Sequence, residues 1–188
     1  MPCPPLPLDH SRSIALVGPM GVGKSTVGRL LAKLLALPFY DSDKVIETRA
    51  GADISWIFDR EGERGFRDRE TAVLKELMAQ RAMVLATGGG IILRRENRQL
   101  LQRADDICYL TAAPELLVER TQKNNKRPLL QVDNPSQRIH SLWRQRDPLY
   151  RQVATMTVAT DQHSPKGTAQ QIIDKIAAKQ WLMKQSLR

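Results

Sequence analysis

The sequence predicts an α/β fold of three layers, in which a parallel β-sheet is covered by helices on both faces. Short apolar segments alternate with helical segments along the chain, and their unbroken apolar character is typical of strands buried on both sides. The 188 residues fit one domain, and a chain of this size buries roughly 70% of the surface that it exposes when unfolded. We therefore expect a single domain over residues 13–188, preceded by a flexible Pro-rich tail over residues 1–12.

Each strand is predicted from a short apolar segment that ends at glycine, proline or polar residues. The predicted strands cover residues 13–18, 39–41, 83–87, 106–111 and 155–159. The first ends at Gly18-Pro19 and the third runs into Gly88-Gly89-Gly90. The second opens with Phe39-Tyr40, directly after a Leu-Pro pair that stops the preceding helix.

The helices are predicted from apolar residues that recur three and four positions apart. The clearest case is 24–36, whose apolar face is formed by Val27, Leu30, Leu31, Leu34 and Leu35. The further predicted helices cover residues 95–103, 114–122, 135–146 and 168–184. A helical pattern also fills most of 44–80, with interruptions near Gly51 and near Gly62–Gly65, and the polar residues 123–127 predict a loop.

The composition excludes several classes of protein. Apolar residues make up 41% of the chain and charged residues 26%, as in soluble globular proteins. No apolar run approaches the ~18 residues of a membrane span, and the first residues lack the basic start and apolar core of a signal peptide. Two cysteines, Cys3 and Cys108, are too few for a disulfide scaffold. These features favour a cytoplasmic protein without a membrane partner.

The net charge of +9 lies entirely in the last third of the chain. Residues 120–188 hold 13 basic and 4 acidic side chains, whereas the two signs balance over the rest. Such an asymmetry points to polyanionic partners. Because the basic residues are spread out with no interleaved aromatic residues, we do not expect nucleic-acid binding as the primary role. A solvated basic face, with a few arginines that bind the phosphates of a nucleotide, explains the pattern better.

A phosphate-binding loop is the strongest local signal. Gly18-Pro19-Met20-Gly21-Val22-Gly23-Lys24-Ser25-Thr26 matches G-x-x-x-x-G-K-[ST] and lies between a predicted strand and a predicted helix. Glycines let successive backbone N–H groups turn toward a phosphate, and the helix N-terminus adds a favourable dipole. Lys24 is placed to reach the β- and γ-phosphates, and the Ser25 hydroxyl to bind Mg²⁺. The loop therefore predicts a nucleoside triphosphate as ligand.

The rest of the chain favours a small-molecule kinase over a motor protein or a GTPase. The strand 83–87 ends in Thr87 and three glycines, where a motor or GTPase usually has a metal-binding Asp, and no Asn-Lys-x-Asp segment is present. Asp41-Ser42-Asp43 follows the second strand, at the sheet edge where ligands bind. One carboxylate is suited to hold Mg²⁺ through water and the other to accept a proton from a hydroxyl. Helix capping explains the same residues equally well.

Several segments together resemble the shikimate kinase family. They are the phosphate loop, Phe39-Tyr40-Asp41-Ser42-Asp43, Gly65-Phe66-Arg67-x-x-Glu70, Ala86-Thr87-Gly88-Gly89-Gly90, Arg120-Thr121, Arg127-Pro128-Leu129-Leu130 and Arg146-x-Pro148-Leu149-Tyr150. They occur in the family's order between about residues 13 and 176. The resemblance implies a P-loop kinase fold with a five-stranded parallel sheet ordered 2-3-1-4-5. It also implies transfer of the γ-phosphoryl group of ATP to the 3-hydroxyl of shikimate, in chorismate biosynthesis, by a monomer.

The resemblance also implies a role for each matching residue. Asp43 contacts the accepting hydroxyl as candidate base, while Ser25 and Asp41 serve Mg²⁺. Residues implied to bind shikimate are Asp43, Phe58, Phe66, Arg67, Gly88, Gly89, Gly90 and Arg146, with the two arginines on its carboxylate. Residues implied to bind ATP are Gly21, Val22, Gly23, Lys24, Ser25, Thr26, Arg120, Arg127 and His163. Lys24 and Arg127 join Asp43 as catalytic residues, and the expected acceptor-binding region and lid cover about 42–80 and 123–133.

Other interpretations remain for single features. Taken alone, Arg67 and Arg146 predict solvated helix faces, and Gly88–Gly90 predicts a flexible turn. Another P-loop kinase, such as a gluconate kinase, is the alternative enzyme, but the arginine pair and the triple glycine favour shikimate. A nucleic-acid-binding NTPase is the alternative from the basic last third, and it predicts salt-sensitive binding to RNA or DNA.

Overall fold

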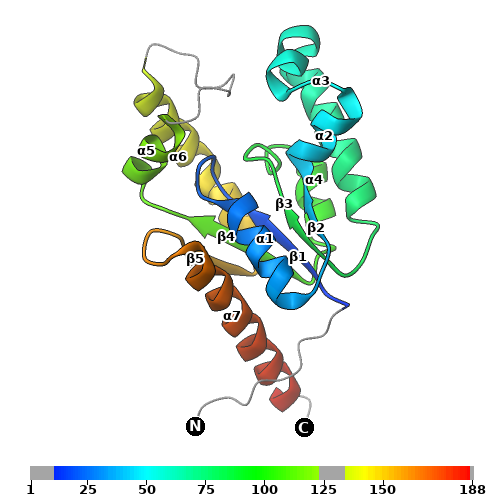
Figure 1. Cartoon of the computed structure of the whole chain (residues 1–188), viewed down its shortest axis with the longest axis vertical. Helices are drawn as coiled ribbons and strands as arrows, with labels where there is room; N and C mark the ends of the chain where they lie inside the picture. The colour runs from blue at the N-terminus through cyan, green and yellow to red at the C-terminus, as the bar shows by residue number, and fades with distance from the viewer. Residues whose placement is uncertain (1–10, 123–133, 187–188) are drawn as a thin grey trace.

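The computed structural model describes residues 11–122 and 134–186, and within them it contains one five-stranded parallel sheet. The strands are β1 (Ser13–Val17), β2 (Phe39–Asp41), β3 (Met83–Ala86), β4 (Asp106–Thr111) and β5 (Met156–Ala159). Their spatial order is β2-β3-β1-β4-β5 (Figure 1), which confirms the predicted topology. The central strand β1 pairs on both sides, so that Leu16 lies opposite Ala86 on β3 and Cys108 on β4.

The helices lie between the strands in sequence, as predicted. They are α1 (Lys24–Leu35), α2 (Ser42–Ala50), α3 (Ile54–Leu77), α4 (Arg95–Leu101), α5 (Pro114–Gln122), α6 (Pro135–Val153) and α7 (Pro165–Ser186). The interruptions within 44–80 occur at Gly51, which ends α2 with a φ of 63°, and at Gly62, which kinks α3 with a φ of 69°. Both angles lie in the left-handed region that glycine adopts without strain.

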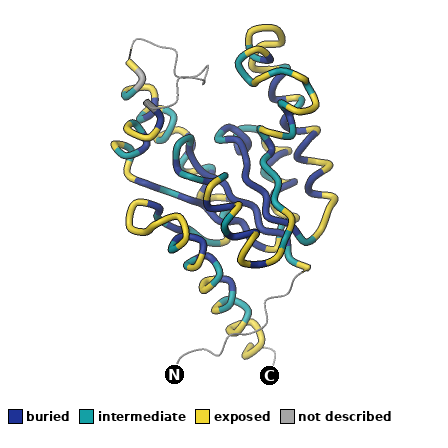
Figure 2. Tube along the Cα trace, viewed as in Figure 1, coloured by how far each residue is buried: buried dark blue, intermediate teal, exposed yellow. Residues whose placement is uncertain are grey.

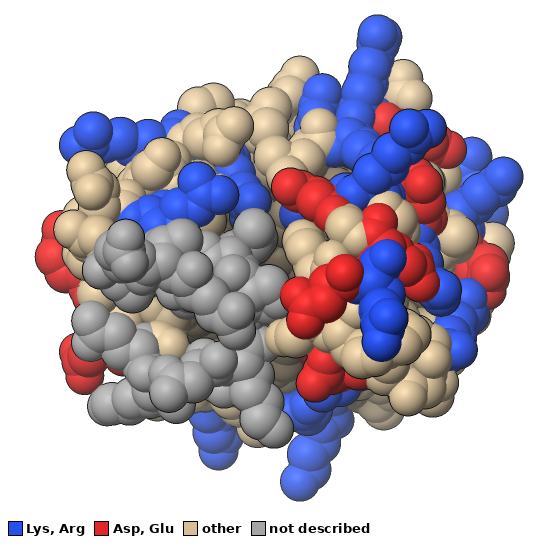
Figure 3. Space-filling model, turned by 90° about the horizontal axis from the view of Figure 1, so that it is seen from above, with Lys and Arg blue, Asp and Glu red and all other residues tan. Residues whose placement is uncertain are grey.

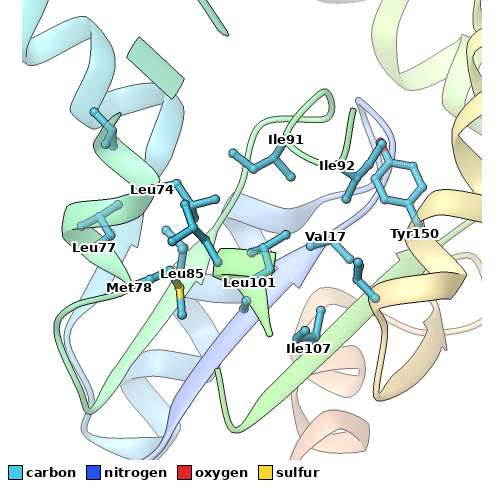
Figure 4. Close-up of a cluster of buried hydrophobic side chains, with 14 of the residues drawn as sticks. Val17, Leu74, Leu77, Met78, Leu85, Ile91, Ile92, Leu101, Ile107 and Tyr150 are labelled. Atoms are coloured by element: carbon cyan, nitrogen blue, oxygen red, sulfur yellow. The ribbon is translucent and has the colours of Figure 1, made fainter. Parts of the chain in front are cut away.

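Two hydrophobic clusters cover the two faces of the sheet. Side chains along a strand alternate between faces, and on β1 Ala15 and Val17 enter one cluster while Ile14 and Leu16 enter the other. The first cluster contains residues of α2, α3, α4 and α6, and part of it is drawn in Figure 4. The second contains residues of α1, α5, α7 and the start of α6. Buried residues therefore run along the strands, and exposed residues follow the outer sides of the helices (Figure 2).

One helix differs clearly from its predicted length. We predicted that α6 ends at residue 146, before Pro148, but it continues to Val153 with Pro148 inside it. A proline within a helix removes one backbone hydrogen bond and is normally unfavourable. Here Tyr150 and Val153 are both buried in the first cluster, and this burial favours the additional turns. The extension brings Tyr150 into the site described below.

Ion pairs with Asp106 of β4 attach both terminal parts of the described chain to the sheet. Arg12, at the end of the predicted tail, donates to Asp106 Oδ2 at 2.7 Å, and Lys179 of α7 donates to the other oxygen at 2.8 Å. Residues 1–10, which include Cys3, lie outside the described residues, whereas Cys108 is a buried free thiol whose pKa is raised by burial. Among the described residues, no helix combines the length and apolar character needed to cross a bilayer.

Candidate active site

The phosphate-loop residues connect β1 to α1 and have the backbone conformation that their glycines predict. Gly18, Gly21 and Gly23 have φ values of 145°, 79° and 100°, and other residues adopt such angles only with strain. Val22 is completely buried in the second hydrophobic cluster. Its side chain therefore anchors the loop, and only its backbone N–H is available to a phosphate.

Lys24 is turned into this loop. Its side chain is largely buried, and its Nζ donates to the carbonyl oxygens of Gly18 and Pro19 at 2.7 and 2.8 Å. The ammonium charge therefore lies inside the curve of the loop, beside the first turn of α1. Both the charge and the helix N-terminus favour a bound anion there.

Asp41 has a geometry that fits both interpretations that the sequence left open, helix capping and a metal ligand. Its Oδ1 accepts from the backbone N–H groups of Asp43 and Lys44, at 3.1 and 3.4 Å, and so caps α2. Its Oδ2 accepts from the Ser25 hydroxyl at 2.6 Å. The capping interpretation is confirmed, and the second oxygen still faces the phosphate loop. Ser25 and Asp41 thus form a pair of oxygen ligands of the kind that Mg²⁺ takes beside nucleotide phosphates.

Asp43 lies in the first turn of α2, directly beside Gly88. A Cβ atom at Gly88 would lie 2.5 Å from Asp43 Oδ1 and 3.1 Å from Glu70 Oε1. Only glycine therefore permits both carboxyl groups to approach this backbone. The position is fixed further by Ser42, whose buried Oγ accepts from the Gly88 N–H at 3.0 Å.

The two arginines are buried, so the interpretation of each as part of a solvated helix face is wrong. Arg67 is 6% exposed and Arg146 is 7% exposed. Arg67 donates to Glu70 Oε2 at 2.8 Å and to Glu63 Oε1 at 3.1 Å. Burial opposes its charged form, but the ion pairs with Glu70 and Glu63 outweigh burial and raise its pKa.

Arg146 has less compensation for its charge. One amino group donates to the Gly89 carbonyl at 3.2 Å, and its buried Nε has no hydrogen-bond partner among the described residues. Burial lowers its pKa, and the nearby charge of Arg67 lowers it further. Two buried guanidinium groups therefore lie close together, and among the described residues only Arg67 has carboxyl groups as hydrogen-bond partners. This arrangement favours an additional anion.

The Gly88–Gly90 turn is held in place rather than flexible. The Gly89 carbonyl accepts from both Arg146 and the Tyr150 hydroxyl. The Ile91 and Ile92 side chains that follow are completely buried in the first cluster (Figure 4). At Gly90, a Cβ atom would overlap the Arg67 guanidinium. Gly88 and Gly90 thus let the backbone approach Asp43, Glu70 and Arg67 closely. The predicted contact of the three glycines with the ring hydroxyls of the substrate stays a prediction.

The predicted apolar residues also lie in this region. The rings of Phe58 and Phe66 are 4.7 Å apart, and the Arg67 guanidinium lies 5.2 Å from the centre of the Phe66 ring. Phe66 is buried and Phe58 is half-buried. The two rings therefore form an apolar wall beside the arginine that is predicted to bind a carboxylate.

The residues predicted near the nucleotide base are only partly brought together. Arg120, on α5, donates to the hydroxyl of Thr160 at 3.2 Å, directly after β5. His163 follows in the same connection and is exposed, as is Thr26 on α1. Arg127 and the predicted lid, 123–133, lie outside the described residues.

Two residues of the site had no assigned role in the sequence interpretation. Glu70 is completely buried, and burial raises the pKa of its carboxyl group from 4.5 to about 7, although Arg67 opposes the shift. Glu70 could have been inferred as the partner of Arg67, because it follows three residues later and lies on the same side of a helix. Tyr150 ended another matching segment, but its position depends on the extension of α6, which the sequence did not indicate.

The surface around the site carries both signs of charge. Seen from above, Lys and Arg side chains lie beside Asp and Glu side chains over the part of the molecule that carries α2 and α3 (Figure 3). The ion pairs made by residues of α3 include Arg69 with Glu61 and Asp68 with Arg94. Most charged residues of α3 are thus exposed, and Arg67 and Glu70 are distinguished from them by their burial.

Comparisons with known proteins agree with this geometry. The family model "Shikimate kinase" matches residues 20–177. The shikimate kinase of Pseudomonas fluorescens (strain Pf0-1) is 52% identical over 166 residues, which cover 88% of this chain and 96% of the relative. That of Actinobacillus pleuropneumoniae serotype 5b (strain L20) is 50% identical over 169 residues, which cover 90% and 98%.

Solved structures give the same result. The structure of shikimate kinase from Acinetobacter baumannii in complex with shikimate has a TM-score of 0.87 and 50% identity, and the match covers 89% of this chain and 94% of that one. A gluconokinase from Sinorhizobium meliloti 1021 has a TM-score of 0.60 at 18% identity, with 93% and 98% covered. The second likeness shows a shared fold alone.

Proposed function

The chain belongs to the shikimate kinase family, and we propose a division of roles among its residues in the reaction of that family. It is an ATP-dependent kinase that phosphorylates shikimate. Its substrates are two anions, a nucleoside triphosphate and a carboxylic acid with three hydroxyl groups. The roles of individual residues, the metal ion and the lid are the proposed part.

The observation that carries the proposal is the pair of buried guanidinium groups beside Asp43. Arg67 and Arg146 bind the shikimate carboxylate, since a planar guanidinium pairs with a carboxylate through two parallel hydrogen bonds. The Gly88–Gly90 backbone contacts the ring hydroxyls, and Phe58 and Phe66 contact the ring. The acceptor is thereby oriented with its 3-hydroxyl toward Asp43.

On the nucleotide side, the phosphate loop and Lys24 bind the β- and γ-phosphates of ATP. The Lys24 ammonium leaves the loop carbonyls for the phosphates, where negative charge develops during transfer. Arg120 and His163 are proposed to lie near the adenine, and Arg127 to reach the transferred phosphoryl group from the lid.

During transfer, the 3-hydroxyl oxygen of shikimate attacks the γ-phosphorus and the bond from that phosphorus to ADP breaks. The hydroxyl proton passes to the Asp43 carboxylate. Because phosphoryl transfer passes through a loose transition state, orientation of the hydroxyl contributes as much as proton removal. The products are shikimate 3-phosphate and ADP.

Ser25 and Asp41 fit a magnesium ion. Mg²⁺ in such sites takes one or two protein oxygens and completes its shell with phosphate and water, and these residues place two oxygens 2.6 Å apart beside the phosphate loop. They would hold Mg²⁺, Asp41 through water, and the ion would neutralise charge on the phosphates. Asp41 would keep its cap on α2.

The test is ADP release from the purified protein with Mg·ATP and shikimate, gluconate, a nucleoside monophosphate or no acceptor. We expect release with shikimate only. In parallel, Asp43→Asn should lower kcat by about 10²- to 10⁴-fold with a modest change in the KM for ATP. Near wild-type turnover in this variant would remove Asp43 from the proposed role, while turnover with another acceptor would overturn the roles of Arg67 and Arg146.

A further inference from the structure

Tyr150 is a completely buried residue of α6 whose hydroxyl donates to the Gly89 carbonyl. Its ring stacks on Tyr109 of β4, with 5.1 Å between the ring centres and 22° between the planes. The Tyr109 hydroxyl in turn donates to Asp147 Oδ1 at 2.7 Å. The Tyr150 ring therefore has a fixed orientation, close to Ile92 and Val17 in the first cluster (Figure 4).

The same Gly89 carbonyl also accepts from Arg146, at 3.2 Å. A carbonyl oxygen has two lone pairs and accommodates both donors. Arg146 in this state has one bond to the backbone, lies directly beside the Tyr150 hydroxyl, and has a buried Nε without a partner among the described residues. To bind a carboxylate through two hydrogen bonds, its guanidinium has to give up or weaken its bond to Gly89.

The cost of that step depends on Tyr150. Without its hydroxyl, the departure of Arg146 would leave the partly buried Gly89 carbonyl with neither of these donors. A polar atom that loses its partners where protein excludes much of the water is unfavourable. With the hydroxyl in place, the carbonyl keeps a strong donor throughout. Burial raises the pKa of the Tyr150 hydroxyl above its ordinary value, so the group stays protonated and able to donate at neutral pH.

We propose that Tyr150 is a positioning residue for shikimate, whose hydroxyl keeps the Gly89 carbonyl bonded while Arg146 turns to the substrate carboxylate. The inference rests on the proposed function, in which Arg146 binds that carboxylate. It assigns to Tyr150 a contribution to acceptor binding that requires no contact with the acceptor. The contribution is absent for an acceptor that does not draw Arg146 away from the backbone.

The test compares Tyr150→Phe with the matched variant Tyr109→Phe. Each removes one hydroxyl from the same stacked pair, but only the first removes a donor from Gly89. We expect Tyr150→Phe to raise the KM for shikimate by about three- to tenfold, the effect of one hydrogen bond. Its kcat and its KM for ATP should stay close to those of the wild type. Tyr109→Phe should lower the melting temperature without changing the KM for shikimate.

Two further measurements separate this proposal from the one on which it rests. Shikimate methyl ester, which lacks the carboxylate charge, should be bound equally by Tyr150→Phe and the wild-type protein. In Arg146→Ala, the added change Tyr150→Phe should have no further effect on the KM for shikimate, because the two residues act as one unit.

The outcomes are distinct. An unchanged KM for shikimate in Tyr150→Phe, or equal increases in the two tyrosine variants, would overturn the role of Tyr150. If Arg146→Ala itself leaves the KM for shikimate unchanged, the carboxylate site is wrong and this inference falls with it. A change in the KM for ATP as large as that for shikimate would show a general distortion and also overturn the specific role.

Discussion

The phosphate loop and the proposed acceptor pocket lie at the same edge of the sheet but are built in opposite ways. The loop is one run of residues, 18–26, and Lys24 is held by carbonyls only five and six residues away. The acceptor pocket takes Asp43 from α2, Arg67 from α3 and Arg146 from α6, around the turn after β3. The first site is local in sequence, and the second exists only when the sheet has assembled.

This difference has an energetic consequence. In the loop, the charged Lys24 bonds to neutral carbonyls of the same segment, so its removal leaves no buried opposite charge among these partners. In the pocket, Arg67 and Glu70 are each other's buried partners, and removal of one leaves the other uncompensated. Substitutions in the loop should therefore affect chemistry most, and substitutions in the pocket should affect both binding and stability.

Lys24→Met should cause the largest loss of activity, with little change in stability. Loss of the ammonium removes charge stabilisation at the transferred phosphoryl group, and kcat should fall by about 10²- to 10³-fold. The free energy of unfolding should change by only about 1 kcal/mol. Lys33→Met is the control, because Lys33 lies on the same helix and is exposed. If Lys24→Met lost as much stability as a pocket variant, the proposed difference between the loop and the pocket would be wrong.

Arg67→Ala should affect both properties. We expect the KM for shikimate to rise roughly 100-fold, since a carboxylate ligand loses a buried charged partner. The free energy of unfolding should fall by about 3 kcal/mol, because Glu70 loses its ion-pair partner. In Arg69→Ala, the exposed pair with Glu61 is lost instead, and neither quantity should change by much. Steady-state kinetics and denaturant unfolding measure the two effects.

The pH dependence of stability tests the buried carboxyl group of the pocket. The pKa of Glu70 is raised from 4.5 to about 7 in the folded state, so the folded protein binds this proton more tightly than the unfolded chain. Glu70 therefore contributes a decrease of about 3 kcal/mol to the free energy of unfolding as pH rises from 4.5 to 7.

The variant Glu70→Gln isolates this contribution, because the amide stays neutral at every pH. The difference in unfolding free energy between the variant and the wild type should shift in favour of the variant between pH 4.5 and 7, and then stay constant. Denaturant unfolding at a series of pH values measures it. A difference that does not vary with pH would show that Glu70 titrates normally.

The smallest expected effect is at the apolar wall. Phe58→Leu removes the contact between the Phe58 and Phe66 rings, which are 4.7 Å apart. It also removes the proposed contact of the Phe58 ring with shikimate. An aromatic contact of this kind contributes about 1 kcal/mol, so the KM for shikimate should rise by about three- to tenfold with little change in kcat. Trp56→Leu, at an exposed position two residues earlier, should have no effect on this KM. Equal kinetics in the two variants would remove Phe58 from the acceptor wall.

The fold was predictable because its signals are short in range. Each strand was recognised from its own apolar run, and α2 and α3 from their spacing and their glycines. The one large error, the end of α6, concerned Pro148, where the local preference of proline opposes the burial of Tyr150 and Val153 against the sheet. The burial depends on residues far away in sequence, and no local pattern contains it.

The site was predictable in unequal parts. Residue identity and spacing indicated the loop, and the resemblance to a family indicated Asp43, Arg67 and Arg146. Taken singly, Arg67 predicts a solvated helix face, which is where Arg69 lies, two residues away. The two arginines differ because one faces the sheet and the other faces solvent, and α3 must be docked before this difference exists.

The sequence by itself determined the strand order that the family shares, the phosphate loop and the chemical class of both substrates. These follow from patterns within a few residues or from several such patterns in a known order. Only the tertiary structure decided which charges are buried, how Glu70 acquires a pKa near 7 and why the Gly89 carbonyl has two donors. Burial and pairing are properties of groups brought together from distant segments, and their energies arise only once water has been excluded from between them.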